Sequence, residues 1–308
     1  MSHDNKILID ARLVHRLITE QFPHWAHLTI KPVEFGGWDN RTFHLGEQMT
    51  VRLPSDIEYV PQVEKEQQWL PKLAPFLPLP IPIPLAMGRP TEYYPWHWSV
   101  YRWLEGKTAS IERITDLTTF ATALANFLIA LQKIDITGGP LATPQNCYRG
   151  GQLKMYDEEA RQAIALLKGK IDTDKITKMW DRALASTWQS TPVWVHGDVA
   201  PTNLLVKDGQ LSAVIDFGSM AIGDPACDLV IAWTLLKGES RDIFLKTLQL
   251  DNDTWARARG WALWKALIIC AELPGTNPLE KERSWKVINE LLYDKMTHKN
   301  VKIIKEFS

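Results

Sequence analysis

The sequence predicts an α+β protein of two lobes, in which a smaller lobe built on an antiparallel sheet precedes a larger, mainly helical lobe. Two observations carry this prediction. Apolar and polar residues alternate in short segments between residues 29 and 53, whereas helical spacing dominates after Gly106. The 308 residues are long for one compact core and sufficient for two lobes. We place the lobes at residues 1–103 and 104–308, with the hinge near residues 102–106.

The first lobe is predicted from five consecutive segments. The segments are distinguished by an N-cap residue, by strand alternation broken by glycines, and by a run of prolines that excludes a helix. They are a short amphipathic helix within residues 7–22 after Asp10, hairpin strands at 29–53, a helix at 57–73, an extended connector at 74–84 and a buried strand at 96–104.

The second lobe is predicted to be helical apart from two short apolar strands. Apolar residues recur with helical periodicity over most of this lobe, and the two strands flank a polar segment. The expected elements are a long helix at 111–134, helices near 154–167 and 174–188, strands at 193–195 and 211–215, and mostly helix from residue 228 onward.

Composition limits the possible partners. Lys and Arg number 35 against 36 Asp and Glu, so no overall field favours nucleic acid or an anionic membrane. The N-terminus lacks a signal-peptide pattern, and no stretch approaches the roughly 18 apolar residues of a membrane span. Three separated cysteines favour a reducing compartment, and we expect them to be buried. We therefore expect a cytoplasmic protein that binds neither nucleic acid nor membrane.

One polar segment has the pattern that phosphoryl transfer requires. An apolar strand ends in His196-Gly197-Asp198, Asn203 follows five residues later, and the next predicted strand ends in Ile215-Asp216-Phe217-Gly218. Phosphoryl transfer needs a carboxylate at the acceptor hydroxyl and hard oxygen ligands for Mg2+. We predict Asp198 as the catalytic base and Asn203 and Asp216 as the metal ligands. Gly218 is expected to let the chain turn sharply.

These motifs resemble those of the aminoglycoside phosphotransferase group, relatives of protein kinases whose corresponding loops read HRDxxxxN and DFG. Gly223-Asp224-Pro225 and the following Asp228 match that group as well. The resemblance implies a bilobal protein-kinase-like fold and the roles just given to the catalytic loop. It also implies that His196 and Asp228 fix that loop through hydrogen bonds.

The resemblance extends to a nucleotide site in the first lobe. Residues 34–43 occupy the place of a phosphate-covering loop, so Gly37 and Asn40 are candidate phosphate contacts through their backbone N–H groups. Arg52 stands where kinases have the lysine that contacts the α- and β-phosphates, a departure that alters the geometry of the contact. Glu66 is its expected ion-pair partner, with Glu64 as the competing choice.

The nucleotide base is expected at the hinge. There the purine would pair with the Arg102 carbonyl and the Leu104 amide, while Tyr101 would close the back of the base site. So large a side chain leads to the hypothesis that guanine is admitted and adenine disfavoured. The co-substrate is accordingly ATP or GTP.

The acceptor is the least defined part of the prediction. The C-terminal helices carry as many basic as acidic residues, without the acidic concentration that a polycationic aminoglycoside would need. A macrolide, a sugar, or an amino alcohol such as choline or homoserine remains open, as does the oligomeric state. Two further alternatives are a nucleotide-binding module without turnover and a protein kinase. The protein kinase is disfavoured because no APE-like segment follows Gly218.

Overall fold

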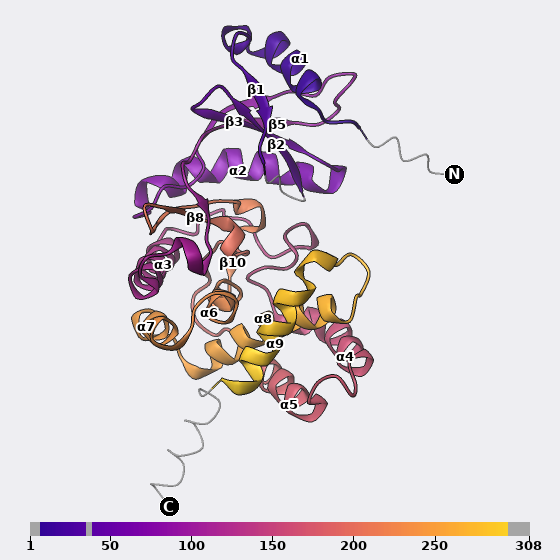
Figure 1. The fold of residues 1–308 in the computed structure, drawn as a ribbon, viewed down its shortest axis with the longest axis vertical. Coiled ribbons are helices and arrows are strands. Elements are labelled where there is room, and N and C mark those ends of the chain that lie inside the picture. The colour runs from indigo at the N-terminus through magenta and orange to yellow at the C-terminus, as the bar shows by residue number, and fades with distance from the viewer. Residues whose placement is uncertain (1–6, 35–38, 295–308) are drawn as a thin grey trace, which may run out of the picture.

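The computed structural model describes residues 7–34 and 39–294. These form two lobes stacked along the long axis of the molecule (Figure 1). The upper lobe holds a sheet of order β1-β2-β3-β5-β4 in which all neighbours are antiparallel. Its strands are β1 (Ile30–Pro32), β2 (Asn40–Leu45), β3 (Met49–Pro54), β4 (Pro84–Gly88) and β5 (Trp98–Arg102). The class, α+β, is the one that the sequence predicts.

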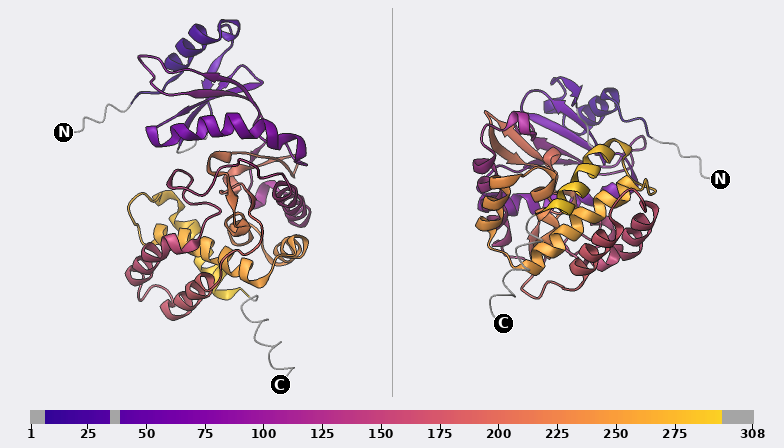
Figure 2. Two further views of the ribbon diagram at one scale, coloured as in Figure 1. Left: turned by 180° about the vertical axis from the view of Figure 1, so that it is seen from behind. Right: turned by 60° about the horizontal axis from the view of Figure 1, so that its bottom comes forward.

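Two helices flank this sheet and differ in what they pack against. Helix α1 (Ala11–Gln21) begins at Asp10, whose carboxylate accepts the backbone N–H groups of Arg12 and Leu13, as the sequence predicts. Its buried face joins the sheet in one core. Helix α2 (Val60–Leu73) lies between the sheet and the lower lobe in both opposite views (Figures 1 and 2). Its residues Trp69, Leu70 and Leu73 belong to the core of the lower lobe, so α2 is packed against both lobes.

The prolines of residues 74–84 were expected to form an extended connector, and the structure corrects both of its ends. A 3-10 turn, Ala74–Phe76, continues directly from α2. The other end enters β4, an edge strand that the sequence reading missed. Proline is tolerated there because Pro84 is the first residue of an edge strand and has no ladder N–H to supply.

The lower lobe combines two small antiparallel sheets with most of the helices. One sheet pairs β7 (Val193–Val195) with β10 (Ala221–Gly223), and the other has the order β6-β8-β9. Its strands are β6 (Lys107–Thr108), β8 (Leu204–Lys207) and β9 (Gln210–Val214). The helices are α3 (Leu117–Gln132), α4 (Asp157–Leu166), α5 (Thr173–Leu184), α6 (Ile231–Thr234), α7 (Gly238–Leu248), α8 (Asn252–Cys270) and α9 (Lys281–Tyr293).

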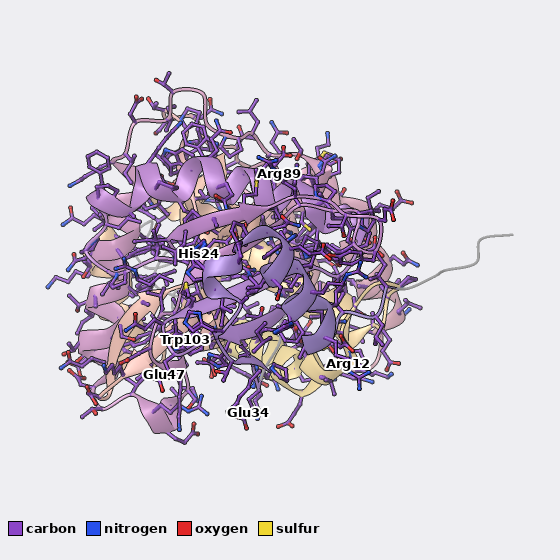
Figure 3. The ribbon with its side chains drawn as sticks, turned by 90° about the horizontal axis from the view of Figure 1, so that it is seen from above. Arg12, His24, Glu34, Glu47, Arg89 and Trp103 are labelled. Atoms are coloured by element: carbon purple, nitrogen blue, oxygen red, sulfur yellow. The ribbon has the colours of Figure 1, made fainter. Side chains whose placement is uncertain are left out.

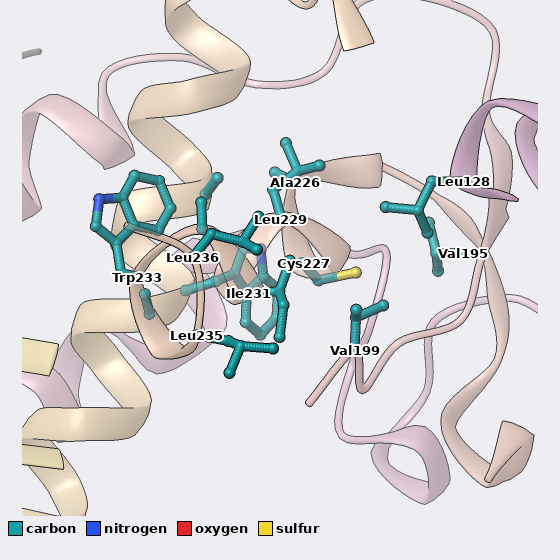
Figure 4. Close-up of a cluster of buried hydrophobic side chains, with 14 of the residues drawn as sticks. Leu128, Val195, Val199, Ala226, Cys227, Leu229, Ile231, Trp233, Leu235 and Leu236 are labelled. Carbon is teal, nitrogen blue, oxygen red and sulfur yellow. The ribbon is translucent and has the colours of Figure 1, made fainter. Parts of the chain in front are cut away.

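A dense apolar core lies beneath the strand that precedes the catalytic loop. Val195, Val199 and Leu128 line one side of it, and Cys227 and Leu229 face them from the segment before α6 (Figure 4). Cys227 and Cys270 are buried as expected, but Cys147 is exposed, at the end of the 3-10 turn Pro144–Asn146. None of the helices in residues 7–34 and 39–294 is long and apolar enough to cross a membrane.

Candidate active site

The catalytic loop leaves β7 at His196 and is fixed by a buried carboxylate. Asp228 accepts the backbone N–H groups of His196 and Gly197, each at 2.7 Å. Gly197 has φ 87°, and a Cβ there would lie 2.4 Å from the Ser219 carbonyl oxygen, so only glycine fits. The loop is therefore held through its backbone.

His196 ties this loop to the segment that carries Asp216. Its Nε2 lies 3.0 Å from the Ile215 carbonyl oxygen, and its Nδ1 lies 3.2 Å from the Asp198 backbone nitrogen. The tautomer with the proton on Nε2 satisfies both contacts, donating at one and accepting at the other. Both His196 and Asp228 thus make the loop-fixing hydrogen bonds that the resemblance implies.

Asp198 and Asn203 meet at the end of this loop. The Asn203 Nδ2 group donates to the Asp198 carbonyl oxygen and to its Oδ2, both at 2.9 Å. Burial would raise the pKa of Asp198, but the positive charges of Lys265 and Arg149 outweigh it and hold the pKa below its ordinary value. The side chain keeps 35% exposure, so a charged carboxylate remains accessible beside Lys265.

Asp216 is placed by an unusual backbone conformation. It has φ 69°, in the left-handed region, while Gly218 has no positive φ. The sequence interpretation assigned the sharp turn to Gly218, and the structure corrects this. Gly218 instead leaves room for Gln62 on α2, because a Cβ there would lie 2.7 Å from Gln62 Oε1 and the amide would have to shift.

Arg52 joins the two lobes at this point. Its Nη2 lies 2.9 Å from Asp216 Oδ1, and its Nη1 lies 3.4 Å from both carboxylate oxygens of Glu66. The Tyr101 hydroxyl donates to Glu66 Oε2. Glu64 points elsewhere, with its Oε1 3.1 Å from His97 Nδ1. The partner of Arg52 is therefore Glu66 and not Glu64, and Arg52 is only 17% exposed.

Two residues near Asp216 were not identified from the sequence. Lys65 Nζ donates to the Gly218 carbonyl oxygen at 2.5 Å, and burial lowers the pKa of Lys65 to about 8. Asp39 Oδ2 accepts from Gln62 Nε2 at 3.1 Å. Burial, with the negative charges of Asp216 and Asp198, raises the pKa of Asp39. Asp39 lies within the predicted phosphate-covering loop at 34–43 but was not singled out there, and no motif marked Lys65, because α2 brings it to the site only in the folded chain.

The expected base-binding hinge follows β5. The Arg102 N–H donates to the Ile83 carbonyl at 3.0 Å, and the Trp103 N–H donates to the Gln48 carbonyl at 2.8 Å. Trp103 therefore lies beside the β2–β3 turn, near Glu47 (Figure 3). Pairing of a purine with the Arg102 carbonyl and the Leu104 amide stays a prediction.

The phosphate-covering loop is only partly described. Asn40 is buried at the start of β2, paired with Pro54 of β3. Gly37 lies outside the described residues. Tyr101, predicted to close the base site, is buried, and its hydroxyl is committed to Glu66.

The donor set at this junction suits Mg2+ bound together with phosphates. Within the described part of the chain, no group of three His, Cys, Asp or Glu side chains could hold a metal by itself. Mg2+ ordinarily takes one or two protein carboxylates and fills its other positions with phosphate oxygens and water. Asp216 and the Asn203 amide oxygen match that requirement.

A family comparison agrees with this geometry. The model of the phosphotransferase enzyme family matches residues 29–261, which include the sheet, α2 and both motifs. The chain belongs to this family. The group predicted from the motifs, the aminoglycoside phosphotransferases, is thereby confirmed, and the protein is a small-molecule phosphotransferase. A search of curated protein sequences found no match.

Solved structures share the fold at low identity. The GDP complex of wild-type aminoglycoside 2'-phosphotransferase-IIIa has a TM-score of 0.69 and 18% identity, covering 93% of this chain and 100% of that one. ADP-bound aminoglycoside phosphotransferase APH(2'')-Ib has a TM-score of 0.57 and 19% identity over 92% and 97%. Macrolide 2'-phosphotransferase MphH from Brachybacterium faecium has a TM-score of 0.58 and 20% identity over 91% and 98%. At these identities the likeness confirms the kinase-like fold alone.

Proposed function

We propose that this phosphotransferase moves the γ-phosphate of ATP or GTP to a hydroxyl group of a small molecule, with Asp198 as the base. The observation that carries the proposal is the contact of Asn203 with Asp198. The amide nitrogen of Asn203 fixes both the carbonyl oxygen and Oδ2 of Asp198, which leaves Oδ1 for an acceptor hydroxyl. The lowered pKa keeps this carboxylate ionised near neutral pH, as a base must be.

The reaction follows from these positions. The acceptor hydroxyl oxygen forms a bond to the γ-phosphorus while the bond from phosphorus to the β–γ bridging oxygen breaks, and the hydroxyl proton passes to Asp198. The nucleoside diphosphate leaves. Asn203 and Asp216 would hold Mg2+, which supplies charge neutralisation at the phosphates when bound. Arg52, kept in place by Glu66, would contact the phosphates on the nucleotide side.

Turnover of nucleotide in the presence of Mg2+ and a panel of amines, sugars and antibiotics tests the proposal. Asp216→Ala should abolish metal-dependent nucleotide binding, whereas Asp198→Asn should leave it largely intact. Labelled phosphate on protein instead of a small molecule would contradict the proposed acceptor class. A parallel assay of ATP and GTP tests the role of Tyr101, and a clear preference for ATP would remove the guanine hypothesis.

The Arg52–Asp216 ion pair favours one second candidate, a nucleotide-binding module without turnover. In that case Arg52 would neutralise Asp216 permanently and no metal would be needed. Nucleotide binding that is independent of Mg2+, without phosphate transfer to any acceptor or to water, would support this candidate.

A further inference from the structure

The surface beside Asp198 carries two positive charges that the predicted nucleotide site does not use. Lys265, on α8, places Nζ 3.7 Å from Asp198 Oδ1 and 4.0 Å from Glu280 Oε2. Both distances exceed a normal hydrogen bond, so these are loose ion pairs. Lys265 keeps 42% of its side chain exposed, and its ammonium group can therefore reach a further ligand.

Arg149 supplies the second charge from the loop before α4. Its Cβ lies 3.0 Å from the position that a Cβ on Gly197 would take, which places it directly against the catalytic loop. Its guanidinium carbon lies 5.1 Å from the ring centre of Trp261 and 5.5 Å from that of Trp264. Across residues 7–34 and 39–294, no carboxylate forms an ion pair with Arg149.

Aromatic side chains hold this guanidinium in place. Tyr156 stacks on Trp264 with ring centres 3.8 Å apart, and its hydroxyl donates to the Cys147 carbonyl at 2.7 Å. Trp264 Nε1 in turn donates to Glu159 at 3.0 Å. A guanidinium packed on ring faces keeps its planar fork of N–H groups for an oxyanion. The arrangement is thus built in advance, and in the part of the chain that the structure describes the Arg149 guanidinium has no side-chain hydrogen-bond or ion-pair partner.

We propose that the acceptor carries an anionic group, a carboxylate or a phosphate, which Arg149 and Lys265 bind while its hydroxyl faces Asp198. This inference rests on the proposed function, because it takes Asp198 as the base. Among residues 7–34 and 39–294, the carboxylates that pair with Lys265 are Asp198 and the half-exposed Glu280. A polycation would therefore meet two like charges and little compensation. Aminoglycosides and choline are therefore disfavoured as acceptors, and hydroxy acids and sugar phosphates are favoured.

Sugars that differ mainly in charge test this inference. Gluconate, glucose and glucosamine each have six carbons. Gluconate carries one negative charge, glucose is neutral and glucosamine carries one positive charge. Glucose 6-phosphate is added to test a phosphate in place of the carboxylate. Binding is followed by thermal shift with Mg2+ and a non-hydrolysable ATP analogue present, since ligands of the folded state raise the midpoint. We expect gluconate or glucose 6-phosphate to bind at least about tenfold more tightly than glucose, and glucosamine most weakly. Which of the two anions binds better distinguishes the carboxylate from the phosphate.

Three variants and one control locate the effect. Arg149→Met and Lys265→Met should each remove most of the preference for the anion, and Lys265→Arg should retain part of it. Lys286→Met removes an exposed lysine that pairs with Glu282 on α9 and should change nothing. The inference would be overturned if the four sugars raised the unfolding midpoint equally, if none of them raised it, or if glucosamine raised it most. So would an anion preference that survives both Met substitutions.

Failure of this inference is distinguishable from failure of the proposed function. Metal-dependent nucleotide binding is measured on the same samples before any sugar is added. If that binding is present and sensitive to Asp216→Ala while the sugars show no charge preference, the acceptor class is wrong and the kinase reaction stands. If metal-dependent binding is absent, the proposed function fails first.

Discussion

The two lobes reach the same junction by different physical means. In the lower lobe, Asp228 holds the catalytic loop through backbone N–H groups, and Asn203 holds Asp198 from five residues away. In the upper lobe, Arg52 and Lys65 reach residues 216–218 with long side chains that cross between the lobes. The predicted acceptor side is therefore held by contacts within one lobe. The nucleotide side depends on contacts that change if the lobes move.

This difference predicts where substitutions affect chemistry, stability or nucleotide affinity. Substitution of a side chain that fixes or belongs to the catalytic loop should lower kcat or the free energy of unfolding, because no neighbouring group can replace its hydrogen bonds. Loss of a cross-lobe side chain should mainly cost nucleotide affinity, because α2 remains packed against the lower lobe through Trp69 and Leu73. Four experiments, from the largest expected effect to the smallest, test this comparison.

Asp198→Asn should lower kcat by roughly 10²–10⁴-fold, because an amide cannot accept the hydroxyl proton. Nucleotide affinity should stay close to that of the parent protein, as measured by titration with Mg2+ present. Asp208→Asn, in the exposed β8–β9 turn, is the matched control and should retain full turnover. Near-normal kcat in Asp198→Asn would show that the base lies elsewhere.

Asp228→Ala should lower the free energy of unfolding by about 3 kcal/mol, because it leaves two buried backbone N–H groups without an acceptor. Urea denaturation followed by circular dichroism measures this. The control Asp242→Ala makes the same substitution at an exposed position of α7, and it should change the free energy of unfolding little. If both variants were equally stable, the catalytic loop would not depend on Asp228, and the contrast between the lobes would weaken.

Arg52→Met should raise the KM for nucleotide by about 10- to 100-fold, because a charge-assisted contact to the phosphates is lost. Burial would lower the pKa of Arg52, but Glu66 and Asp216 raise it, so the guanidinium is charged in the free protein. Arg52→Lys should recover part of the affinity. Arg12→Met, on the outer helix α1 (Figure 3), serves as the control. A fall in kcat at unchanged KM would assign Arg52 to the chemical step instead.

Lys65 should make stability depend on pH between about 8 and 10.5. Its pKa is lower in the folded chain than in the unfolded chain, so the unfolded chain binds more protons across this window and stability rises with pH. Between pH 7.5 and pH 10, the free energy of unfolding should rise by about 1 to 3 kcal/mol more in the parent protein than in Lys65→Met. Urea denaturation at the two pH values measures this difference. Equal pH slopes in the two proteins would mean that Lys65 is not buried at the junction.

Much of the site was predictable because its residues are close along the chain. The distance from Asp198 to Asn203 is limited by five residues of backbone, so their contact follows from the motif. The resemblance also predicted Glu66 as the partner of Arg52, with Glu64 as the competing choice. The choice between them was made by packing, which buries Glu66 and leaves Glu64 beside His97.

Other features could not be predicted, because they depend on which elements pack together. The turn at residues 216–218 uses a positive φ at Asp216, whereas the sequence predicted that Gly218 would turn the chain. The edge strand β4 forms because β5 offers it a hydrogen-bonding partner, although Pro84 and the prolines that precede it argue against a strand. Neither Lys65 nor Asp39 is marked by a motif.

By itself the sequence determined the family and the two-lobed α+β class, and it brought Asp198 close to Asn203, because short-range spacing along the backbone limits their geometry. The metal-binding roles of Asn203 and Asp216 stay predictions. Only the tertiary structure decided that Arg149 and Lys265 lie beside Asp198. Long-range contacts of this kind arise when a helix such as α8 packs against a loop distant in the chain. The position of a charged side chain then depends on the shape of the whole core, which no local pattern records.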